Sequence, residues 1–269
     1  MWPSRPGDVN GDGLDDLLTG QSNHEAYLYL GPVSTSLDGS GWSTRFVDGA
    51  ASIVAGSPVA GKGDINGDGY PDVAVGDTGS FTGPGSVSLF LSPVFGEHSI
   101  DDADATLLGT ECWVCCDGFG KYIYSDADFG HAIELADVNN DGFADAIVGA
   151  PGTGVEGAGG ECVTTAGGVV YIFFGPLSGT LSATEADVAI GALGLGDSLG
   201  SAVAAAGDVN ADGFTDLIVG GANVGTEGAA YLLYGPIDGP VDLARSRSAP
   251  TDLFNAPIPR PQGLQARSI

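Results

Sequence analysis

Four short apolar runs recur along the chain, and each of them ends at a glycine. They read LLTG at 17–20, VAVG at 73–76, AIVG at 146–149 and LIVG at 217–220. Their length and their content of Val, Ile and Leu are typical of buried β-strands, and they are too short to be helices. The pattern of hydrophobic positions therefore predicts a repeated architecture built from strands.

Three further strands are predicted around these runs. A longer apolar run that ends in a turn follows each of them, at 26–32, 86–93, 169–176 and 230–236. Runs of small residues, which suit a crowded inner strand, precede three of them, at 53–60, 131–136 and 201–206. Outer strands are expected near 42–48, 103–108 and 186–190.

The recurrence of this four-stranded unit indicates the fold class. Units of four antiparallel strands repeated around an axis are the blades of a β-propeller. A β-sandwich with long turns is the alternative, and the recurrence of the whole unit disfavours it. We therefore predict an all-β protein made of four-stranded propeller blades.

An acidic nonapeptide of the form D-x-N-x-D-G-x-x-D leads into each LLTG-like run. Side-chain oxygens at positions 1, 3, 5 and 9 and the carbonyl at position 7 can surround a hard cation, and Gly at position 6 permits the sharp turn. Such donors suit calcium better than zinc or magnesium. The predicted ligands are Asp8, Asn10, Asp12, Leu14 and Asp16; Asp64, Asn66, Asp68, Tyr70 and Asp72; Asp137, Asn139, Asp141, Phe143 and Asp145; and Asp208, Asn210, Asp212, Phe214 and Asp216.

Two other interpretations of this nonapeptide are less favoured. A plain solvated turn explains one copy, because Asp, Asn and Gly are common turn residues, but it does not explain four copies of the same pattern. An EF-hand shares the first six positions but needs Glu at position 12 and flanking helices. Position 12 is instead Thr19, Val75, Val148 or Val219. The loops are therefore predicted to join two strands and to bind up to four Ca²⁺ ions.

Charge and composition exclude several partner classes. The formal net charge is −27, which argues against binding to nucleic acid or to an anionic membrane surface. The chain is 43% hydrophobic and contains 46 glycines without a collagen-like period, as expected for a turn-rich β-protein. No apolar run approaches the ~18 residues of a membrane span, and residues 1–7 lack the apolar segment of a signal peptide.

A known family signature can be read around the third loop. Phe129-Gly130 precedes the loop, and Gly149-Ala150-Pro151 follows it. Variants of this signature stand at 199–200 with 220–222 and, more weakly, at 55–56 with 76–77. The chain thus resembles the FG-GAP repeats of integrin α-subunit propellers and of many secreted bacterial proteins.

This resemblance implies a calcium-stabilised propeller used for adhesion or ligand display. In the family, the calcium loops join the first two strands of a blade, on the face away from the usual ligand surface. A complete propeller of the family has seven blades, so four repeats predict a partial or open propeller. The repeats are expected at about 1–48, 49–108, 109–190 and 191–244, followed by a poorly ordered tail at 245–269 that holds Pro and Arg.

Both ends of the predicted arc are expected to be incomplete. Residues 1–7 are short and contain two prolines, so the first blade is predicted to lack its inner strand. The fourth strand of the last blade would come from about 237–243, where Gly239 and Pro240 interrupt it. Two unpaired edges would then remain, and we expect the isolated chain to self-associate through them or to be marginally stable.

The four cysteines are Cys112, Cys115, Cys116 and Cys162. The C-x-x-C spacing at 112–115 is compatible with a zinc or redox site, but no βαβ pattern surrounds it. For an extracellular chain a disulfide is favoured, and we predict that Cys162 pairs with one of the other three. The sequence leaves the choice among them open.

One motif invites a catalytic interpretation. Residues 196–200 read G-D-S-L-G and match the G-x-S-x-G nucleophile elbow. The elbow needs a helix after the serine and a histidine later in the chain, whereas a run of small residues follows here and His24, His98 and His131 all lie upstream. The chain is therefore predicted to be non-enzymatic.

These observations combine into one functional expectation. We expect a calcium-binding extracellular or cell-surface scaffold for cell adhesion or ligand binding, with a protein or glycan as its partner. The alternatives are a carbohydrate-binding lectin and an accessory propeller of a secreted hydrolase.

Overall fold

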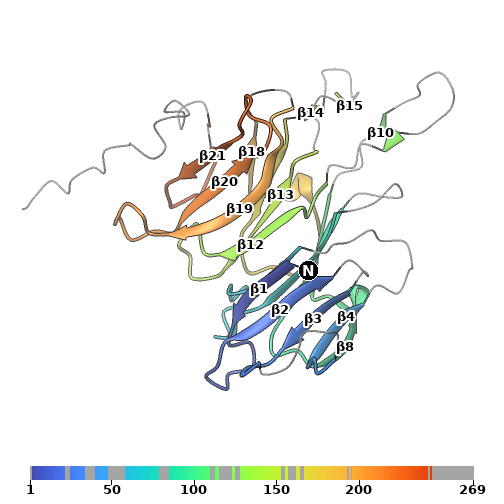
Figure 1. Cartoon of the computed structure of the whole chain (residues 1–269). Coiled ribbons are helices and arrows are strands. Elements are labelled where there is room, and N and C mark those ends of the chain that lie inside the picture. The colour runs from blue at the N-terminus through green and yellow to red at the C-terminus, as the bar shows by residue number, and fades with distance from the viewer. Residues whose placement is uncertain are drawn as a thin grey trace, which may run out of the picture.

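The structure is a computed structural model that describes most of the blade region. The described residues are 2–21, 25–33, 40–47, 58–78, 85–109, 113–114, 123–124, 128–152, 155–156, 162–163, 167–192, 194, 196–241 and 243. They form four main sheets that follow one another in chain order as an open arc of propeller blades (Figure 1). The prediction of an all-β, open propeller is confirmed.

Blade one contains five strands in the order β1-β2-β3-β4-β8. They are β1 (Trp2–Gly7), β2 (Asp16–Gln21), β3 (Glu25–Tyr29), β4 (Thr44–Val47) and β8 (Gly96–Ser99). The prediction that this blade lacks its inner strand is wrong, because β1 pairs antiparallel with β2 despite its two prolines. A shift of register between Ser4 and Gly7 accommodates Pro6, so the proline does not have to donate to the ladder.

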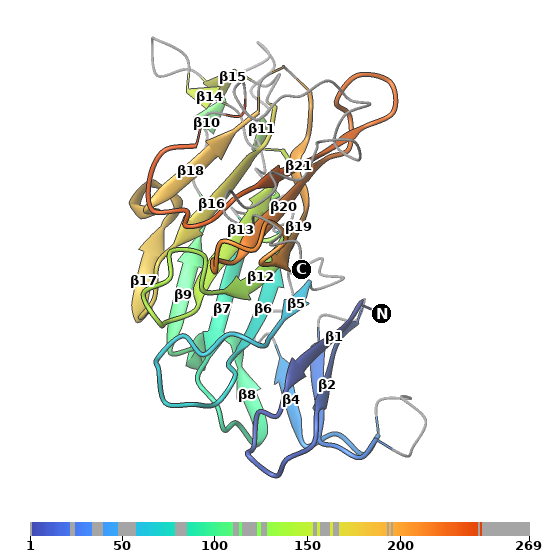
Figure 2. The ribbon, with the colours of Figure 1, turned by 90° about the vertical axis from the view of Figure 1, so that its left-hand side faces the viewer.

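Blade two has the order β5-β6-β7-β9-β17, which Figure 2 shows side by side. Its strands are β5 (Val59–Ala60), β6 (Val73–Asp77), β7 (Ser86–Phe90), β9 (Ala105–Leu108) and β17 (Gly179–Ser182). The outer strand expected near 103–108 is confirmed as β9. Only the end of the inner strand expected at 53–60 lies within the described residues.

Blades three and four complete the arc. Blade three contains β12 (Ala132–Ala136), β13 (Asp145–Ala150), β16 (Val169–Phe173) and β18 (Val188–Gly191). Blade four contains β19 (Leu199–Gly207), β20 (Asp216–Gly221) and β21 (Ala229–Leu233). All strands within these two sheets pair antiparallel, as predicted.

The two parallel pairings connect neighbouring blades. β8 lies between β7 and β9 in sequence, but it pairs with β4 of blade one. β17 lies between β16 and β18, but it pairs with β9 of blade two. Each is followed by a 3-10 turn with a capping box, at Ile100–Asp102 and Ala183–Glu185. The link between the third and fourth strands of a blade thus adds a fifth strand to the preceding blade.

Residues 237–241 form no strand, in agreement with the expected interruption at Gly239 and Pro240. This segment follows Gly-Pro just as the segments containing β8 and β17 follow Ser-Pro and Gly-Pro. Ile237 is buried, and its N–H donates to the carbonyl of Val138 in blade three at 2.7 Å. The segment therefore stands where a link to the preceding blade would be, and not where the fourth strand of blade four would be.

Three apolar cores lie between successive sheets. Leu18, Leu28 and Phe46 of blade one pack with Val73, Val75 and Phe90 of blade two. Val87, Leu89 and Leu107 of blade two pack with Phe129, Tyr171 and Phe173 of blade three. Ile147, Val170 and Ile172 of blade three pack with Leu217, Val219 and Tyr231 of blade four. Because an inner blade is covered on both faces, its central strand β13 is buried along its whole length.

Two short hairpins lie outside the blades. β10 (Trp113–Val114) pairs with β11 (Ile123–Tyr124), and β14 (Val155–Glu156) pairs with β15 (Cys162–Val163). Figures 1 and 2 show both hairpins at the same end of the molecule.

Cys112, Cys115 and Cys116 lie outside the described residues, and only the backbone of Cys162 is described. The predicted disulfide and the predicted disorder of the tail at 245–269 therefore stay predictions.

Candidate metal-binding loops

Each acidic nonapeptide joins the first two strands of its blade. The loops run from β1 to β2, β5 to β6, β12 to β13 and β19 to β20. Since antiparallel strands alternate in direction, all four loops lie at one end of the blades, and the connections from second to third strands lie at the other. The expectation that each loop joins the first two strands of its blade is therefore confirmed.

The first, third and fifth positions organise the turn. In the third loop, Oδ2 of Asp137 accepts from the N–H of Gly142 at 3.0 Å, and Oδ1 of Asp137 accepts from the N–H of Asp141 at 3.2 Å. Nδ2 of Asn139 donates to Oδ2 of Asp141 at 2.8 Å, and Oδ1 of Asp141 accepts from the N–H of Phe143 at 2.9 Å. The other three loops repeat these bonds.

The ninth position is buried and connects the loop to its own sheet. Oδ2 of Asp145 accepts from the N–H of Val138 at 2.9 Å, and Oδ1 accepts from the N–H of Gly175, after the third strand, at 3.1 Å. Asp16, Asp72 and Asp216 make the equivalent pairs of bonds. The sequence pattern marked these four residues only as ligands, so their structural role was missed.

Burial makes the ninth carboxylate electrostatically unfavourable. The pKa of Asp72 is raised to about 6, because desolvation and the nearby charges of Asp68 and Asp64 together outweigh the hydrogen bonds from Ser92 and Ile65. Desolvation likewise raises the pKa of Asp145 to about 6 and raises that of Asp16. A cation bound beside these groups would relieve both the like-charge repulsion and the desolvation of the charge.

Neighbouring loops touch through the seventh position. A Cβ atom on Gly11, in the first loop, would lie 2.7 Å from Cε1 of Tyr70 in the second loop. A Cβ atom on Gly67, in the second loop, would lie 2.7 Å from Cε1 of Phe143 in the third. These glycines also have φ of +76°, which favours glycine for a second reason. An aromatic ring at position 7 therefore covers position 4 of the preceding loop, and the first three loops form a row.

The donor set can be compared with the needs of a metal ion. Within the described ranges, no three Asp, Glu, His or Cys side chains gather into a metal-binding group. The loop oxygens instead accept from the backbone of their own turn. Each carboxylate oxygen has two acceptor sites, so a hydrogen-bonded oxygen can also ligate a cation. The all-oxygen donors and the uncompensated ninth carboxylate fit a hard divalent cation such as calcium.

Ser198 in the G-x-S-x-G motif has a strained backbone with φ of +54°, as in a nucleophile elbow, but the helix that the elbow needs does not follow it. Ser198 is followed by β19 and not by a helix, which confirms the expected strand. Its Oγ accepts from Nδ2 of Asn223 at 2.9 Å.

No helix in the described part of the chain has the length and apolar character needed to cross a membrane.

The buried ninth carboxylate leads to a prediction that does not require a metal. Asp145→Asn replaces an acceptor with an amide group that faces a buried N–H, so in a calcium chelator it should lower the free energy of unfolding by about 1–3 kcal/mol. Asp141→Asn, at an exposed position of the same loop, is the control and should have little effect under these conditions. Urea unfolding of both variants checks this, and equal effects would contradict the structural role of Asp145.

Family models match the segments that carry the loops. The FG-GAP-like repeat model matches residues 8–75, and the FG-GAP repeat model matches residues 129–173 and 199–233. These ranges contain all four acidic loops and most of the blade strands.

Known proteins with similar sequences are much longer. Integrin alpha-V of Gallus gallus is 33% identical over 234 residues, covering 82% of this chain and 20% of the integrin. Integrin alpha pat-2 of Caenorhabditis elegans is 30% identical over 189 residues, covering 67% of this chain and 14% of that protein. Phosphatidylinositol-glycan-specific phospholipase D of Bos taurus is 34% identical over 163 residues, covering 58% of this chain and 17% of that protein. The chain thus spans about a fifth or less of the length of these relatives. Its repeats, its blades and these similarities together show that the chain belongs to the FG-GAP repeat family and resembles the propeller of integrin α-subunits.

Proposed function

We propose that this chain is a calcium-binding scaffold that acts outside the cell in adhesion or ligand display and catalyses no reaction itself. The observation that carries the proposal is the set of four equivalent acidic loops, each with a buried ninth carboxylate that forms no ion pair with a described cationic side chain. In the proposal, oxygens at positions 1, 3, 5, 7 and 9 of each loop hold one Ca²⁺.

Calcium in these loops would act on stability and shape. Each loop connects the two inner strands of its blade, and its ninth carboxylate also holds the turn after the third strand. A bound cation would neutralise part of the repulsion within the loop and make the turn more rigid. The opposite end of the blades would then be free to present a ligand surface, as the family resemblance implies.

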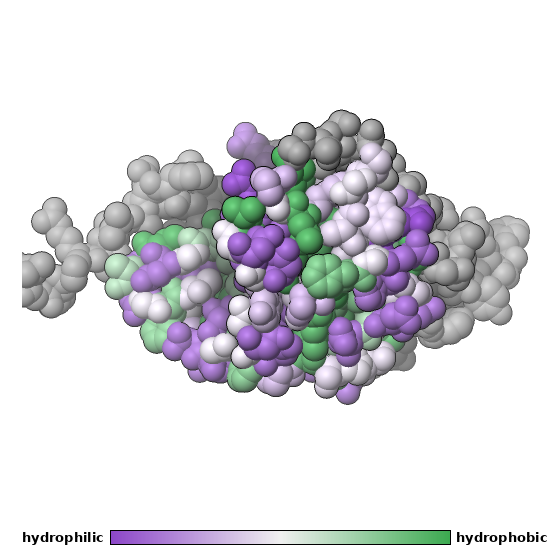
Figure 3. Space-filling model, turned by 90° about the horizontal axis from the view of Figure 1, so that it is seen from below, coloured by the Kyte–Doolittle hydropathy of each residue, from purple (hydrophilic) through white to green (hydrophobic). Residues whose placement is uncertain are grey.

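The expected partner follows from charge and surface character. With a net charge of −27, the chain favours a neutral or cationic protein surface, or a glycan, over polyanions. Figure 3 shows one face of the molecule on which hydrophilic residues surround a narrow hydrophobic band. This face has the character of a solvated surface.

The metal proposal predicts a calcium-dependent melting temperature. Extracellular calcium modules bind with dissociation constants of about 10⁻⁴ to 10⁻³ M. Calcium at ten times that constant would stabilise the fold by roughly 1.4 kcal/mol per site, so four sites should raise the Tm by several degrees. Calorimetry in calcium, in magnesium and in chelator measures this effect.

A matched control separates specific binding from a general effect of salt. Asp68→Asn and Asp141→Asn change exposed positions 5 of two loops, and each should remove one site from a calcium titration. An identical Tm in calcium and in chelator would contradict the metal proposal. Calcium-dependent attachment of cells or glycans to immobilised protein would then test the adhesion role separately.

A second candidate function has one specific observation in its favour. The similarity to phosphatidylinositol-glycan-specific phospholipase D places comparable repeats within a protein named as a hydrolase. An accessory propeller beside a separate catalytic domain is therefore the second candidate. A hydrolase activity that copurifies only with a longer product of the same gene would favour it.

A further inference from the structure

Positive charge is scarce in this chain, which contains 8 Lys and Arg residues against 35 Asp and Glu residues. Three of the cations lie within the described residues, namely Arg5, Arg45 and Lys62. Arg45 forms ion pairs with Glu25 and Glu97. Arg5 and Lys62 form no ion pair with any carboxylate of the described residues. In a chain so rich in carboxylates, two cations without such a partner need an explanation.

The two cations line the same cavity. A cavity of about 190 Å³ lies where the inner strands of the first three blades meet. Figure 2 shows these strands, β1, β5 and β12, next to one another. Arg5 comes from β1, Lys62 follows β5 and Glu134 comes from β12, and all three contribute to the lining. Two cations and one carboxylate therefore converge there from three different blades.

Lys62 is held at this cavity by an unusual backbone conformation. Its N–H donates to the carbonyl of Pro6 at 2.8 Å, which joins the end of β5 to β1. Its φ is +77°, in the left-handed region that residues with side chains rarely adopt. Glycine would adopt this conformation without cost, and a strained residue is a reason to look for a function. The strain therefore fits a role for the ammonium group at the cavity.

Glu134 is the acidic member of the group. Burial raises the pKa of Glu134, while a hydrogen bond with the backbone of Ala205 and the charge of Lys62 oppose this shift. Lys62 thus acts on Glu134 through space, yet the two side chains form no ion pair. Because both line the cavity without joining, a small molecule inside it can contact both.

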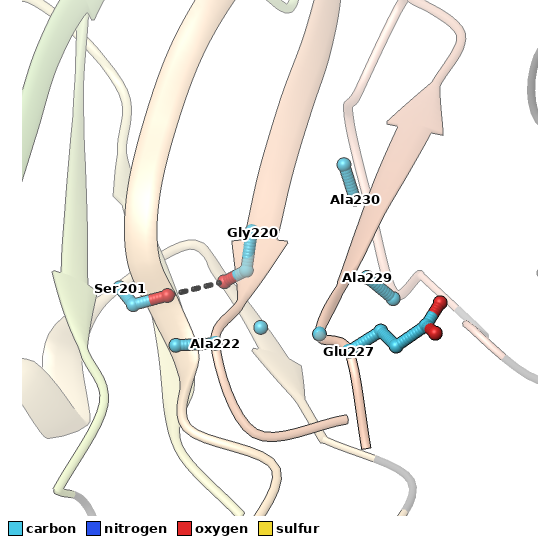
Figure 4. Close-up of a pocket in the computed structure, with 8 residues that line it drawn as sticks. Ser201, Gly220, Ala222, Glu227, Ala229 and Ala230 are labelled. Atoms are coloured by element: carbon cyan, nitrogen blue, oxygen red, sulfur yellow. Dashed lines mark hydrogen bonds between the residues drawn. The ribbon is translucent and has the colours of Figure 1, made fainter. Parts of the chain in front are cut away.

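A second cavity, on blade four, lacks this combination of charges (Figure 4). It has a volume of about 400 Å³ and is lined by glycines and alanines together with Ser201 and Glu227. Oγ of Ser201 donates to the carbonyl of Gly220 at 3.3 Å. No cation contributes to its lining, so nothing in this cavity favours an anionic ligand.

We propose that the cavity between β1, β5 and β12 binds a small hydroxycarboxylate, the acidic sugar residue of a glycan. Arg5 would bind the carboxylate through two parallel N–H groups, and Lys62 would add a point charge. Glu134 would accept a hydrogen bond from a hydroxyl group of the same sugar. In naming a ligand, this inference rests on the proposed ligand-binding role, but it does not rest on calcium, because none of the three residues belongs to an acidic loop.

Size and charge restrict the ligand to this class. Drug-sized molecules fill pockets of about 300–1,000 Å³, so the smaller cavity suits one sugar residue. A phosphate or sulfate group would present charged oxygens to Glu134. An amino acid would bring a third cation close to Arg5 and Lys62. A neutral hydroxyl group as the donor avoids both kinds of repulsion.

The charge of the whole chain favours a single carboxylate over a polyanion. A net charge of −27 repels a chain of many acidic sugars. Charges farther away than about 8 Å are largely screened at physiological ionic strength, so the two nearby cations decide the local attraction. A glycan with one terminal acidic sugar is therefore the expected source.

An NMR titration of the full chain with glucuronate tests the site. We expect the backbone amide signals of Arg5, Lys62 and Glu134 to shift in a saturable way. Methyl glucoside lacks the carboxylate and acetate lacks the hydroxyl groups, so the first should not bind and the second should bind more weakly. Alanine and lactate are the probes for an amino acid and for a simple hydroxy acid.

Three variants connect the shifts to the proposed contacts. Arg5→Gln and Lys62→Gly should each weaken glucuronate binding by about tenfold or more, because each removes a charged donor. Lys62→Gly should keep the fold, since glycine accepts a positive φ. Thr180→Asp, at an exposed position on the opposite edge of the same sheet, lowers the net charge by the same amount as Arg5→Gln and should not change binding. Glu134→Gln should reduce the preference for glucuronate over acetate.

The proposal is overturned if glucuronate does not shift these signals, if methyl glucoside binds equally well, or if Arg5→Gln and Lys62→Gly bind like the unchanged chain. Tighter binding of alanine or lactate than of glucuronate overturns the assignment to an acidic sugar. The titration is made in calcium and in chelator, beside the Tm measurement. A calcium-dependent Tm without glucuronate binding contradicts only this inference, whereas glucuronate binding with an identical Tm contradicts only the metal proposal.

Discussion

Gly149→Val is expected to separate blade four from blade three and to lower the free energy of unfolding by about 3 kcal/mol or more. The added Cβ would lie 2.0 Å from the carbonyl oxygen of Gly200, a backbone atom that cannot rotate away. Relief requires the two sheets to move apart, and the core between them contains fully buried side chains such as Ile147 and Leu217. The cost therefore exceeds that of ordinary overpacking in a flexible core.

Urea unfolding followed by Tyr and Trp fluorescence measures this effect. Gly220→Val is the matched control, because it adds the same side chain at the same strand position of the next blade, where the described atom nearest to the added Cβ is Cβ of Ala202 at 3.3 Å. We expect it to change the free energy of unfolding by less than about 1 kcal/mol. Equal denaturation midpoints for the two variants would show that the close contact between Gly149 and Gly200 does not limit blade packing.

Phe129→Ala is expected to destabilise the protein by about 3–5 kcal/mol. Phe129 is 0% exposed and lies between blades two and three. Its ring centroid is 5.7 Å from that of Tyr171 and 6.4 Å from that of Phe173, the latter in an edge-to-face arrangement. Truncation removes these contacts and leaves a cavity, which a sheet fixed by its strand pairing cannot fill by collapse.

Two further variants calibrate this result. Phe129→Leu should cost much less than Phe129→Ala, because blade four uses the buried Leu199 at the same position. Phe95→Ala removes a ring that is 56% exposed and should change stability by less than about 0.5 kcal/mol. A Phe129→Ala variant as stable as Phe95→Ala would mean that Phe129 does not anchor its blade.

The predicted strands agreed with the structure where local pattern decides the outcome. The apolar runs at 146–149 and 217–220 lie in β13 and β20, because short runs rich in Val and Ile gain most when buried in a sheet. The acidic loops connect the expected strands, because Asp and Asn side chains accept hydrogen bonds from the backbone of the turn and Gly permits its sharp bend. The recurrence of the same pattern in four repeats supported each of these predictions.

The prediction failed or was incomplete where a contact joins distant parts of the chain. No strand was predicted at residues 1–7 because of their two prolines, yet β1 pairs with β2 there through a shift of register. The parallel strands β8 and β17 carry no strong local strand signal, and only the edge of the preceding blade makes them strands. The aromatic ring of Phe143 was expected to matter only for its carbonyl, whereas its side chain covers Gly67 of another loop.

The sequence by itself determined the repeat, the class of each strand and the acidic loop, because these depend on residues within a few positions of one another. Only the tertiary structure decided which faces are covered. Ile147 and Ile218 occupy the same place in the repeat and have similar neighbours in sequence, yet one is buried and the other is 40% exposed. Burial is a property of the adjacent sheet, and no local pattern specifies whether that sheet is there.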